Sequence, residues 1–398
     1  MNGTAERSVP RRGGNVKVKI DSLAFGGDGV GRLDGKVCFV PGALPGEEVV
    51  FETVKETSDY IKGRLKEILI RSSDRVEPVC PYYGKCGGCQ TQHLAYEKEV
   101  FFKQSQLFEL LKRIARENDP VCLDMERSGG DGYGYRSSIT LHRKNNRWGF
   151  YGVDGATIIP VDRCPIADEA INAELGDVSA PEAKDNVTLK TDWAGKVWMS
   201  DRPGERFFSD RYLDKELLFS PKAFSQANRH ISERIALTLE EWIGPRGEDS
   251  VFFDAYCGVG FYTFLSAGAF ASKVGMDVAR TAIECAKSTA AKDKRDNARF
   301  YVADAEKEFQ GIFERQKGRD NVVFLDPPRK GASKEFLESI SVSGDVGGIY
   351  YLSCDPARLA RDVRIISSGG KWKMSRVKPF DMFPRTRHIE ALAEFVKK

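Results

Sequence analysis

This sequence has few features that would place the chain in a membrane or outside the cell. Its longest apolar runs fall well short of the roughly 20 residues that a membrane-spanning helix requires. The first residues lack the apolar core of a signal peptide, so we expect a cytoplasmic protein without a membrane or obligate protein partner. Nine cysteines are an odd number, and without a secretion signal they favour metal binding or catalysis over a disulfide framework.

Excess charge of one sign is also scarce. The net charge of the 398-residue chain is only +3, so a nucleic-acid site has to arise from local clusters of basic side chains. Hydrophobic residues make up 41% and charged residues 30%, as in a globular protein. A chain of this length exceeds one hydrophobic core, so two or three domains are expected.

The N-terminal part of the chain predicts a tail followed by a small barrel. Residues 1–15 carry arginines and few apolar side chains, which predicts a disordered basic tail. From 16 to 72, short strands alternate with turns, a pattern typical of an antiparallel OB-like β-barrel, a class that often binds oligonucleotides. The glycine-rich stretch 26–31 lacks the Lys-Ser/Thr end of a phosphate loop, so we interpret it as hairpin turns.

The central region, 73–216, opens with a cysteine cluster. Cys80, Cys86 and Cys89 lie within ten residues, together with two glycines that let the backbone fold around a metal. Tetrahedral coordination by zinc or by a cubane cluster requires a fourth ligand. His93 nearby and Cys164 further along the chain are the two candidates.

Two further segments of this region have recognisable patterns. Residues 94–116 predict an amphipathic helix, which we expect to pack on the catalytic domain. Residues 133–151 alternate like strands and interleave basic with aromatic side chains, which suits RNA contacts and equally suits a solvated sheet face. These side chains are Tyr135, Arg136, His142, Arg143, Lys144, Arg147, Trp148 and Tyr151.

Residues 217–398 alternate buried strands with helices. The first strand ends in a Gly-x-Gly turn, Gly258–Gly260. Asp277 ends the next strand about 20 residues later, a placement suited to ribose hydroxyls, and Asp304 ends a third strand, where it suits an adenine amino group. This pattern is typical of methyltransferases that use S-adenosylmethionine. A dinucleotide-binding domain is less favoured because only two of three fingerprint glycines are present.

Cys354 follows a strand-like run, 349–353, and precedes a predicted helix at 357–363. A thiol at a helix N-terminus has a depressed pKa and is nucleophilic, and the carboxyl ends of parallel strands are where ligands bind. A second strand, 322–325, brings Asp326 to the same edge. A buried structural cysteine is the alternative, and the local pattern leaves the two interpretations balanced.

Together these segments resemble the RNA (uracil-5-)-methyltransferase family, in its branch with a TRAM domain and a [4Fe-4S] cluster. The resemblance covers most of the chain and is most specific in the motifs at 324–331, 351–356 and 382–390. It implies an α/β Rossmann-like class I methyltransferase domain, an N-terminal OB-like TRAM barrel and a central β-rich iron-sulfur domain. It also implies a nucleophile, Cys354, and a base, Glu390, with His388 as the local rival for the base.

The resemblance assigns the remaining site residues and the substrates. The cluster ligands would be Cys80, Cys86, Cys89 and Cys164, and the cofactor contacts would be Gln226, Tyr256, Phe261, Asp277, Asp304 and Asp326. The implied reaction is methylation of uridine C5 by S-adenosylmethionine, in 23S rRNA by preference and in tRNA as the alternative. A non-catalytic iron-sulfur RNA-binding protein and an amino-methyltransferase are the competing readings; Arg329 and Cys354 argue against the latter.

Three positions depart from the family pattern. Asp355 follows the nucleophile where asparagine is usual, and its extra negative charge is expected to raise the pKa of the thiol. Phe261 replaces a residue that is often polar, and Asp277 is shorter than the usual glutamate. Contacts to the methyl donor are therefore expected to differ in detail.

Overall fold

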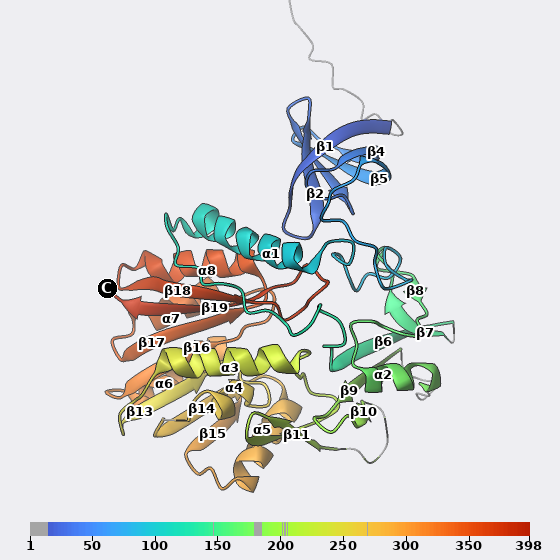
Figure 1. Ribbon diagram of the computed structural model, residues 1–398. Coiled ribbons are helices and arrows are strands. Elements are labelled where there is room, and N and C mark those ends of the chain that lie inside the picture. Colours follow the sequence, from blue (N-terminus) through green and yellow to red (C-terminus); the bar gives the residue numbers. More distant parts are fainter. Residues whose placement is uncertain are drawn as a thin grey trace, which may run out of the picture. The chain divides into compact units, whose positions relative to one another are not determined.

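A computed structural model describes residues 15–145, 147–178, 185–200, 202, 204, 206–268 and 270–398 (Figure 1). The tail predicted at 1–15 lies outside this part of the chain, apart from its last residue. By packing, the chain forms two compact units. The first contains the described residues up to Gly84 together with Gly88–Gln106 and Arg385–Arg387, and the second contains Lys85–Gly87, Leu107–Pro384 and His388–Lys398. The three folded domains expected from the sequence stay a prediction.

The first unit contains a closed barrel, as predicted, but it is not wholly antiparallel, because its third and fifth strands pair in parallel. Its strands are β1 (Asn15–Leu23), β2 (Asp28–Leu33), β3 (Lys36–Pro41), β4 (Glu48–Glu56) and β5 (Tyr60–Ile70), in the order β1-β2-β3-β5-β4. The predicted hairpin turn is present at Gly26 and Gly27, between the antiparallel strands β1 and β2, whereas the rest of 26–31 belongs to β2, which begins at Asp28. A Cβ at Gly31, inside that strand, would lie 2.3 Å from the carbonyl oxygen of Lys19, so this glycine allows close strand approach.

The central strands form a five-stranded sheet in the second unit. Its order is β10-β9-β6-β7-β8, and helix α2 (Glu169–Glu174) and the short 3-10 turn η2 (Leu175–Asp177) accompany it. The strands are β6 (Ser138–Lys144), β7 (Arg147–Tyr151), β8 (Ile158–Ile159), β9 (Asn186–Thr191) and β10 (Val197–Met199). A two-stranded ribbon, β11 (Phe208–Tyr212) and β12 (Lys215–Phe219), follows.

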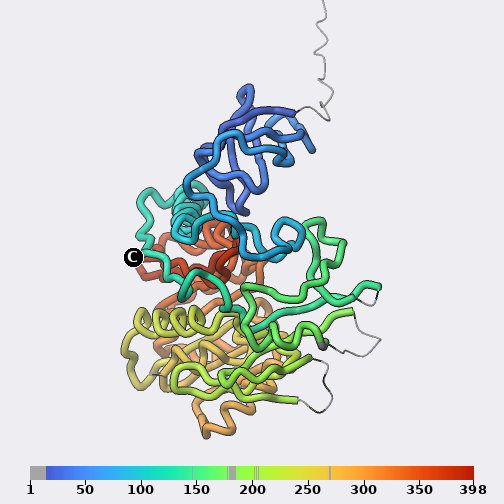
Figure 2. Tube along the Cα trace, turned by 45° about the vertical axis from the view of Figure 1, so that its right-hand side comes forward, coloured from blue at the N-terminus to red at the C-terminus, as the bar shows by residue number. Residues whose placement is uncertain are grey.

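The rest of the second unit is a seven-stranded sheet in the order β15-β14-β13-β16-β17-β19-β18. Its strands are β13 (Ser250–Asp254), β14 (Ser272–Asp277), β15 (Ala298–Val302), β16 (Asp320–Leu325), β17 (Val346–Ser353), β18 (Trp372–Phe380) and β19 (Glu390–Lys397). Strands β13 to β17 are parallel, whereas β19 runs antiparallel to both of its neighbours. The C-terminus follows β19 (Figure 2).

Helices cover both faces of this sheet, because successive strand residues are apolar on both sides. Phe252, Phe324 and Leu352 pack into the core beneath α3 (Arg229–Ile243), α4 (Phe261–Leu265) and α5 (Arg280–Lys292). The alternate strand residues pack beneath α6 (Ala305–Phe313), α7 (Lys334–Val342) and α8 (Pro356–Ser368). The 3-10 turn η3 (Glu314–Gln316) extends α6.

The helix expected at 94–116 consists of two parts. The α-helix α1 (Tyr96–Leu110) is continued by a π-helical turn, η1 (Leu111–Ala115). From Leu107 onward its apolar side chains belong to the same core as α8. No helix in the described ranges is both long and apolar enough to cross a membrane.

Candidate active site

The strand register brings the predicted nucleophile and base to one edge of the sheet. Ser353, the last residue of β17, pairs with Ala391 of β19. Cys354 and Glu390 occupy the next positions on the two antiparallel strands, so they lie on neighbouring strands at the same edge. Asp326 directly follows β16, the other neighbour of β17. Because β16 and β17 are parallel, Asp326 lies at this edge as well.

The Cys354 thiol is half-buried and protonated at neutral pH. Burial raises its pKa to about 12, with further contributions from the carboxyls of Glu390 and Asp326, while Arg329 opposes the shift. The prediction of a depressed pKa is therefore wrong for the protein without its substrates. The N–H groups of Ala357 and Arg358, at the start of α8, donate to the Asp355 carboxylate at 2.9 and 3.0 Å, so Asp355 acts as the helix cap.

Three carboxyls near Cys354 have raised pKa values. Burial raises the pKa of Glu390 well above its usual value, and Asp326 raises it further. Burial and the charges of Asp254 and Asp277 raise the pKa of Asp326 to about 8. Asp254 ends β13, where burial raises its pKa to about 7 although its Oδ2 accepts a hydrogen bond from the Thr263 hydroxyl at 2.6 Å. Such clustered, perturbed acids are typical of active sites.

The Gly-x-Gly turn lies at the switch point of the sheet, where β13 has β14 on one side and β16 on the other. Gly258 donates its N–H to Asp277 Oδ2 at 3.0 Å, and Asp277 Oδ1 accepts from the N–H of Ala279 at 2.8 Å. Asp277 therefore orients the glycine turn from the end of the neighbouring strand. This crevice is where an open α/β sheet binds its ligand.

The other residues predicted to contact the methyl donor lie on separate elements. Asp304 caps α6 through the N–H of Glu306 at 3.1 Å, and the Tyr256 hydroxyl donates to Glu306 Oε1 at 3.1 Å. Phe261 is buried at the start of α4. Gln226 is half-buried on the segment before α3, and its backbone carbonyl accepts a hydrogen bond from the hydroxyl of Ser137 at 3.3 Å.

Some site residues were missed by sequence reasoning. Asp254 ends a buried strand, the same signal that selected Asp277, and it could have been found in this way. Arg329 was noted only as a departure from another motif, although it faces both Cys354 and Glu390. The rival base, His388, packs edge-on against Phe383 with ring centroids 6.0 Å apart.

The predicted metal ligands are divided between the two units, with Cys80 and Cys89 in the first and Cys86 and Cys164 in the second. Cys86 and Cys164 interact electrostatically, and burial raises the pKa of the Cys164 thiol. Across the residues that the structure describes, no group of three or more His, Cys, Asp or Glu side chains is arranged to hold a metal. His93 Nδ1 already pairs with the hydroxyl of Tyr83.

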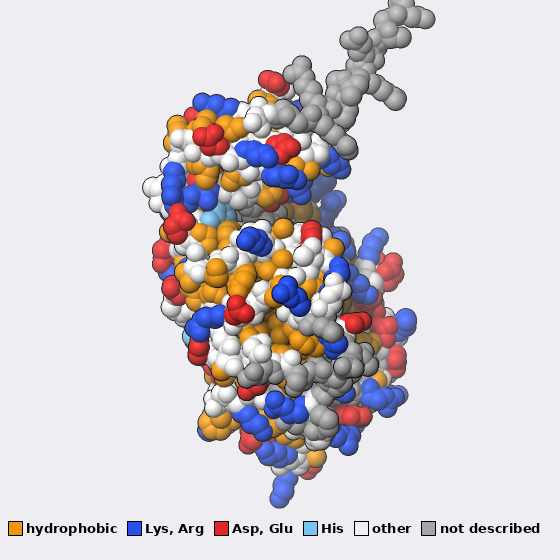
Figure 3. All heavy atoms as spheres, turned by 90° about the vertical axis from the view of Figure 1, so that its right-hand side faces the viewer, with side chains coloured by type: hydrophobic (Ala, Val, Ile, Leu, Met, Phe, Trp, Pro, Cys, Tyr) orange, Lys and Arg blue, Asp and Glu red, His pale blue; other side chains and the backbone are white. Residues whose placement is uncertain are grey.

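Some of the basic and aromatic side chains of residues 133–151, called the basic-aromatic strip below, make contacts within the protein. Tyr135 donates its hydroxyl to the carbonyl of Pro384 at 3.1 Å, and Arg136 Nε donates to the carbonyl of Ser138. The rings of His142 and Tyr151 are in contact, with centroids 4.2 Å apart and their planes tilted by 37°. On the face drawn in Figure 3, Lys and Arg side chains are interspersed with acidic and apolar ones, so RNA contact by this strip stays a prediction.

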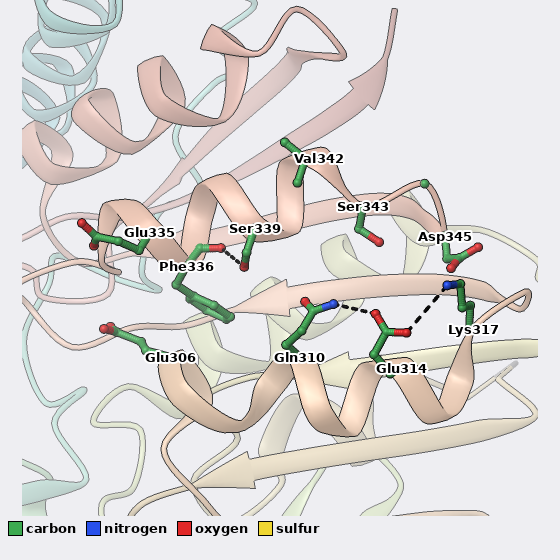
Figure 4. A pocket seen from close by; sticks show the side chains of 11 residues that line it. Glu306, Gln310, Glu314, Lys317, Glu335, Phe336, Ser339, Val342, Ser343 and Asp345 are labelled. Carbon is green, nitrogen blue, oxygen red and sulfur yellow. Dashed lines mark hydrogen bonds and ion pairs between the residues drawn. The ribbon is translucent and has the colours of Figure 1, made fainter.

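A groove of about 520 Å³ lies between α6 and α7 and is lined mostly by acidic and polar side chains (Figure 4). Within it, Gln310 Nε2 donates to Glu314 Oε1 at 2.7 Å, and Lys317 Nζ lies 3.8 Å from Glu314 Oε2. Gln310, Glu314 and Lys317 therefore pair with one another, and none of the residues predicted for the active site lines this groove.

The sequence was compared with known families and proteins. Residues 208–398 match the family described as tRNA (uracil-5-)-methyltransferase, and residues 11–66 match the TRAM domain. An uncharacterized RNA methyltransferase of Bdellovibrio bacteriovorus is 32% identical over 97% of this chain and 96% of that protein. The 23S rRNA (uracil(1939)-C(5))-methyltransferase of Vibrio campbellii is 30% identical over 96% of this chain and 95% of that protein.

A solved structure has the same fold. The Pyrococcus abyssi tRNA (uracil-54, C5)-methyltransferase, in complex with S-adenosyl-L-homocysteine, superimposes with a TM-score of 0.72. It is 23% identical and covers 96% of this chain and 100% of that chain. The expected class I methyltransferase fold with an N-terminal TRAM barrel is therefore confirmed.

Proposed function

Because this chain belongs to the RNA (uracil-5-)-methyltransferase family, we propose that it transfers a methyl group from S-adenosylmethionine to C5 of one uridine in 23S rRNA. The observation that carries this proposal is the neighbouring placement of Cys354 and Glu390 at the edge that also holds the Gly-x-Gly turn. A thiol and a carboxyl on adjacent strands can act on adjacent atoms of one pyrimidine ring.

Uridine C5 is too weak a nucleophile to accept a methyl group unaided. In the proposed mechanism the Cys354 thiolate forms a bond to C6, and the displaced electron pair gives an enolate with carbanion character at C5. C5 then attacks the methyl carbon of the sulfonium of S-adenosylmethionine; the bond from this carbon to sulfur breaks, its electron pair stays on sulfur, and S-adenosylhomocysteine leaves. Glu390 accepts the proton left on C5, and β-elimination breaks the bond from sulfur to C6, which restores the C5–C6 double bond and releases the thiolate.

The charges at this edge have to change before the first step. Without substrates, the raised pKa of Cys354 keeps the thiol protonated, and Arg329 is the described cation that lowers this pKa. A bound sulfonium donor would bring a second positive charge to the same edge, which favours the thiolate. Donor binding is therefore expected to precede addition of the thiolate to the base.

The donor is proposed to lie against the glycine turn. Asp277, with one carboxylate oxygen on the N–H of Gly258, would accept from the ribose hydroxyls, and Asp304 would face the adenine. Gln226, Tyr256 and Phe261 complete this proposed contact set, and Asp326 would hold the uracil edge or the donor.

The target RNA can be identified directly. Donor carrying a labelled methyl group is incubated with separated rRNA and tRNA that lack uridine methylation, and the labelled nucleoside is identified by mass. We expect 5-methyluridine in large-subunit rRNA, as the name of the Vibrio relative suggests. 5-Methyluridine in tRNA, the second candidate, would keep the mechanism and change the substrate. Label in adenosine or guanosine, or in no RNA, would contradict the proposal.

We also propose that Cys80, Cys86, Cys89 and Cys164 bind a [4Fe-4S] cluster. The four thiols have the required chemistry, and Cys86 and Cys164 lie close enough to interact electrostatically. No catalytic step depends on the cluster. Anaerobically purified protein should contain about four irons and four sulfides per chain, whereas stoichiometric zinc would contradict this assignment.

A further inference from the structure

The active-site edge contains buried polar oxygens that have no hydrogen-bond partner. Tyr262 Oη and Glu390 Oε2 are both inaccessible to solvent and have no partner within the described ranges. Tyr262 is only 3% exposed and Glu390 only 8%. Since a buried unsatisfied polar atom is costly, native proteins usually pair such atoms with ordered water or with a ligand.

The ring of Tyr262 is held firmly, so its hydroxyl has a defined position. Tyr262 is the second residue of α4, and its ring packs edge-on against Phe324, with centroids 5.1 Å apart, and against Phe261 at 5.0 Å. Both contacts are apolar. They explain the position of the ring but provide no partner for the hydroxyl.

Carboxyl groups surround this hydroxyl. The ionisable groups that act on Tyr262 are Asp326, Glu390, Asp254 and Tyr212. Asp326 also acts on Glu390, which in addition faces Arg329. Asp326 and Glu390 therefore both act on the Tyr262 hydroxyl, and Asp326 also acts on Glu390. Burial raises the pKa of Tyr262 well above its usual value, so the hydroxyl keeps its proton and can donate it in a hydrogen bond.

We propose that Tyr262 is a positioning residue for the general base: its hydroxyl, Asp326 and Glu390 Oε2 together hold one ordered water, through which Tyr262 stabilises the ionised Glu390 carboxylate. A water with three polar partners satisfies both of the unpartnered oxygens. A hydrogen bond that reaches the charged form of a carboxyl favours that form, and only the ionised form can accept the proton from C5. This inference rests on the proposed function, because it assigns Glu390 the role of base.

The test uses Tyr262→Phe in the full-length protein, a change that removes one oxygen and keeps the ring. Loss of a hydrogen bond to a charged group is expected to lower kcat about tenfold at neutral pH. The KM for S-adenosylmethionine should stay within about twofold. Because proton removal follows methyl transfer, the SDS-resistant adduct between protein and RNA should accumulate during turnover.

The pH profile distinguishes this role from a structural one. Loss of the hydrogen bond raises the pKa of Glu390, so the acid limb of kcat should move to higher pH and the activity of the variant should recover toward that of the wild type in alkaline solution. Tyr350→Phe is the matched control, since it removes a buried hydroxyl that donates to the carbonyl of Trp242 instead. This control variant should change neither the pH at which the acid limb of kcat falls nor the amount of adduct.

A double variant completes the test. Once Glu390→Gln has removed the carboxylate, adding Tyr262→Phe should leave the lifetime of the adduct unchanged. An unchanged acid limb in Tyr262→Phe, or a loss of activity that alkaline pH does not reverse, would overturn the inference while the methylation reaction stands. If the wild-type protein itself forms no 5-methyluridine, the proposed function fails instead.

Discussion

Glu47 in the first unit, which contains the barrel, and Glu390 in the second unit, which contains the seven-stranded sheet, are both buried carboxyls. Their surroundings shift their pKa values in opposite directions. Burial alone would raise the pKa of Glu47, but hydrogen bonds from Arg75 and from backbone N–H groups outweigh it and lower the pKa. Its oxygens accept from Arg75 Nε at 2.6 Å, Arg75 Nη2 at 2.8 Å and the N–H of Leu44 at 2.9 Å. Glu390 Oε2 has no partner in the described structure, and its pKa is raised.

The difference separates a carboxyl that stabilises the fold from one that is available for chemistry. Glu47 joins residues far apart in the sequence, and all of its hydrogen-bonding capacity serves that purpose. Glu390 Oε2 has no partner among the described protein groups, at an edge that also holds Asp326 and Cys354. Active sites retain such groups because water, the substrate or the transition state supplies the partner.

The largest effect should come from Cys354→Ala. Removal of the nucleophile is expected to lower methyl transfer about 10³-fold or more, because nothing else at this edge can activate C5. Donor binding should persist, since the glycine turn and Asp277 are untouched. Labelled methyl incorporation and equilibrium donor binding measure the two effects. Cys122→Ala, which removes another half-buried thiol, should stay near the wild-type rate; a similar rate for Cys354→Ala would refute its role as nucleophile.

Glu390→Gln should lower turnover by about 10²–10⁴-fold, the usual range for a general base. Because the methyl group is transferred before the proton leaves, this variant should accumulate an SDS-resistant adduct with RNA. Gel electrophoresis of labelled RNA detects the adduct. If His388→Ala accumulates it and Glu390→Gln does not, the base is His388.

Glu47→Gln tests the other side of the comparison. It leaves Arg75 without its anionic partner, which should destabilise the barrel by roughly 3–5 kcal/mol, as loss of one member of a buried ion pair does. Hydrogen exchange of the β1 and β4 amides in the full chain measures this local stability. Glu67→Gln changes an exposed carboxyl of β5 and should have little effect. Glu390→Gln should leave the exchange rates of these amides unchanged. If the amides of Glu47→Gln were as protected as those of the wild type, the contrast between the two carboxyls would be lost.

The smallest effect concerns the Cys354 thiol without substrates. Since its pKa is raised to about 12, the thiolate is the minor form at pH 7–9 and its fraction grows about tenfold per pH unit. Alkylation of Cys354, followed by mass spectrometry of its peptide, should accelerate to the same degree. Arg329→Met removes the charge that opposes the shift and should slow alkylation. A rate independent of pH in this range would mean that the thiol is already ionised.

The linear sequence was sufficient for the order of elements in the methyltransferase domain. The strands that end in Asp254 and Leu325 contain continuous apolar runs, and such runs are visible without tertiary information because a doubly covered sheet buries both faces of each strand. The motif that contains Cys354 likewise predicted a strand followed by a helix, as the structure has it. The glycines of β2 were misread because their role is close strand approach, which depends on residues distant in the sequence.

The sequence by itself therefore determined the barrel and the alternating sheet and singled out Cys354 and Glu390 as the proposed nucleophile and base, since each depends on short-range periodicity or on a local motif. Tertiary structure decided their electrostatics. The pKa of Cys354 is raised, not lowered, because burial and the carboxyls of Glu390 and Asp326 converge on it from neighbouring strands. Tertiary structure also decided that the Tyr262 hydroxyl has no protein partner among the described residues. Whether a buried polar atom is satisfied depends on the atoms that folding places around it, and those come from segments far apart in the chain.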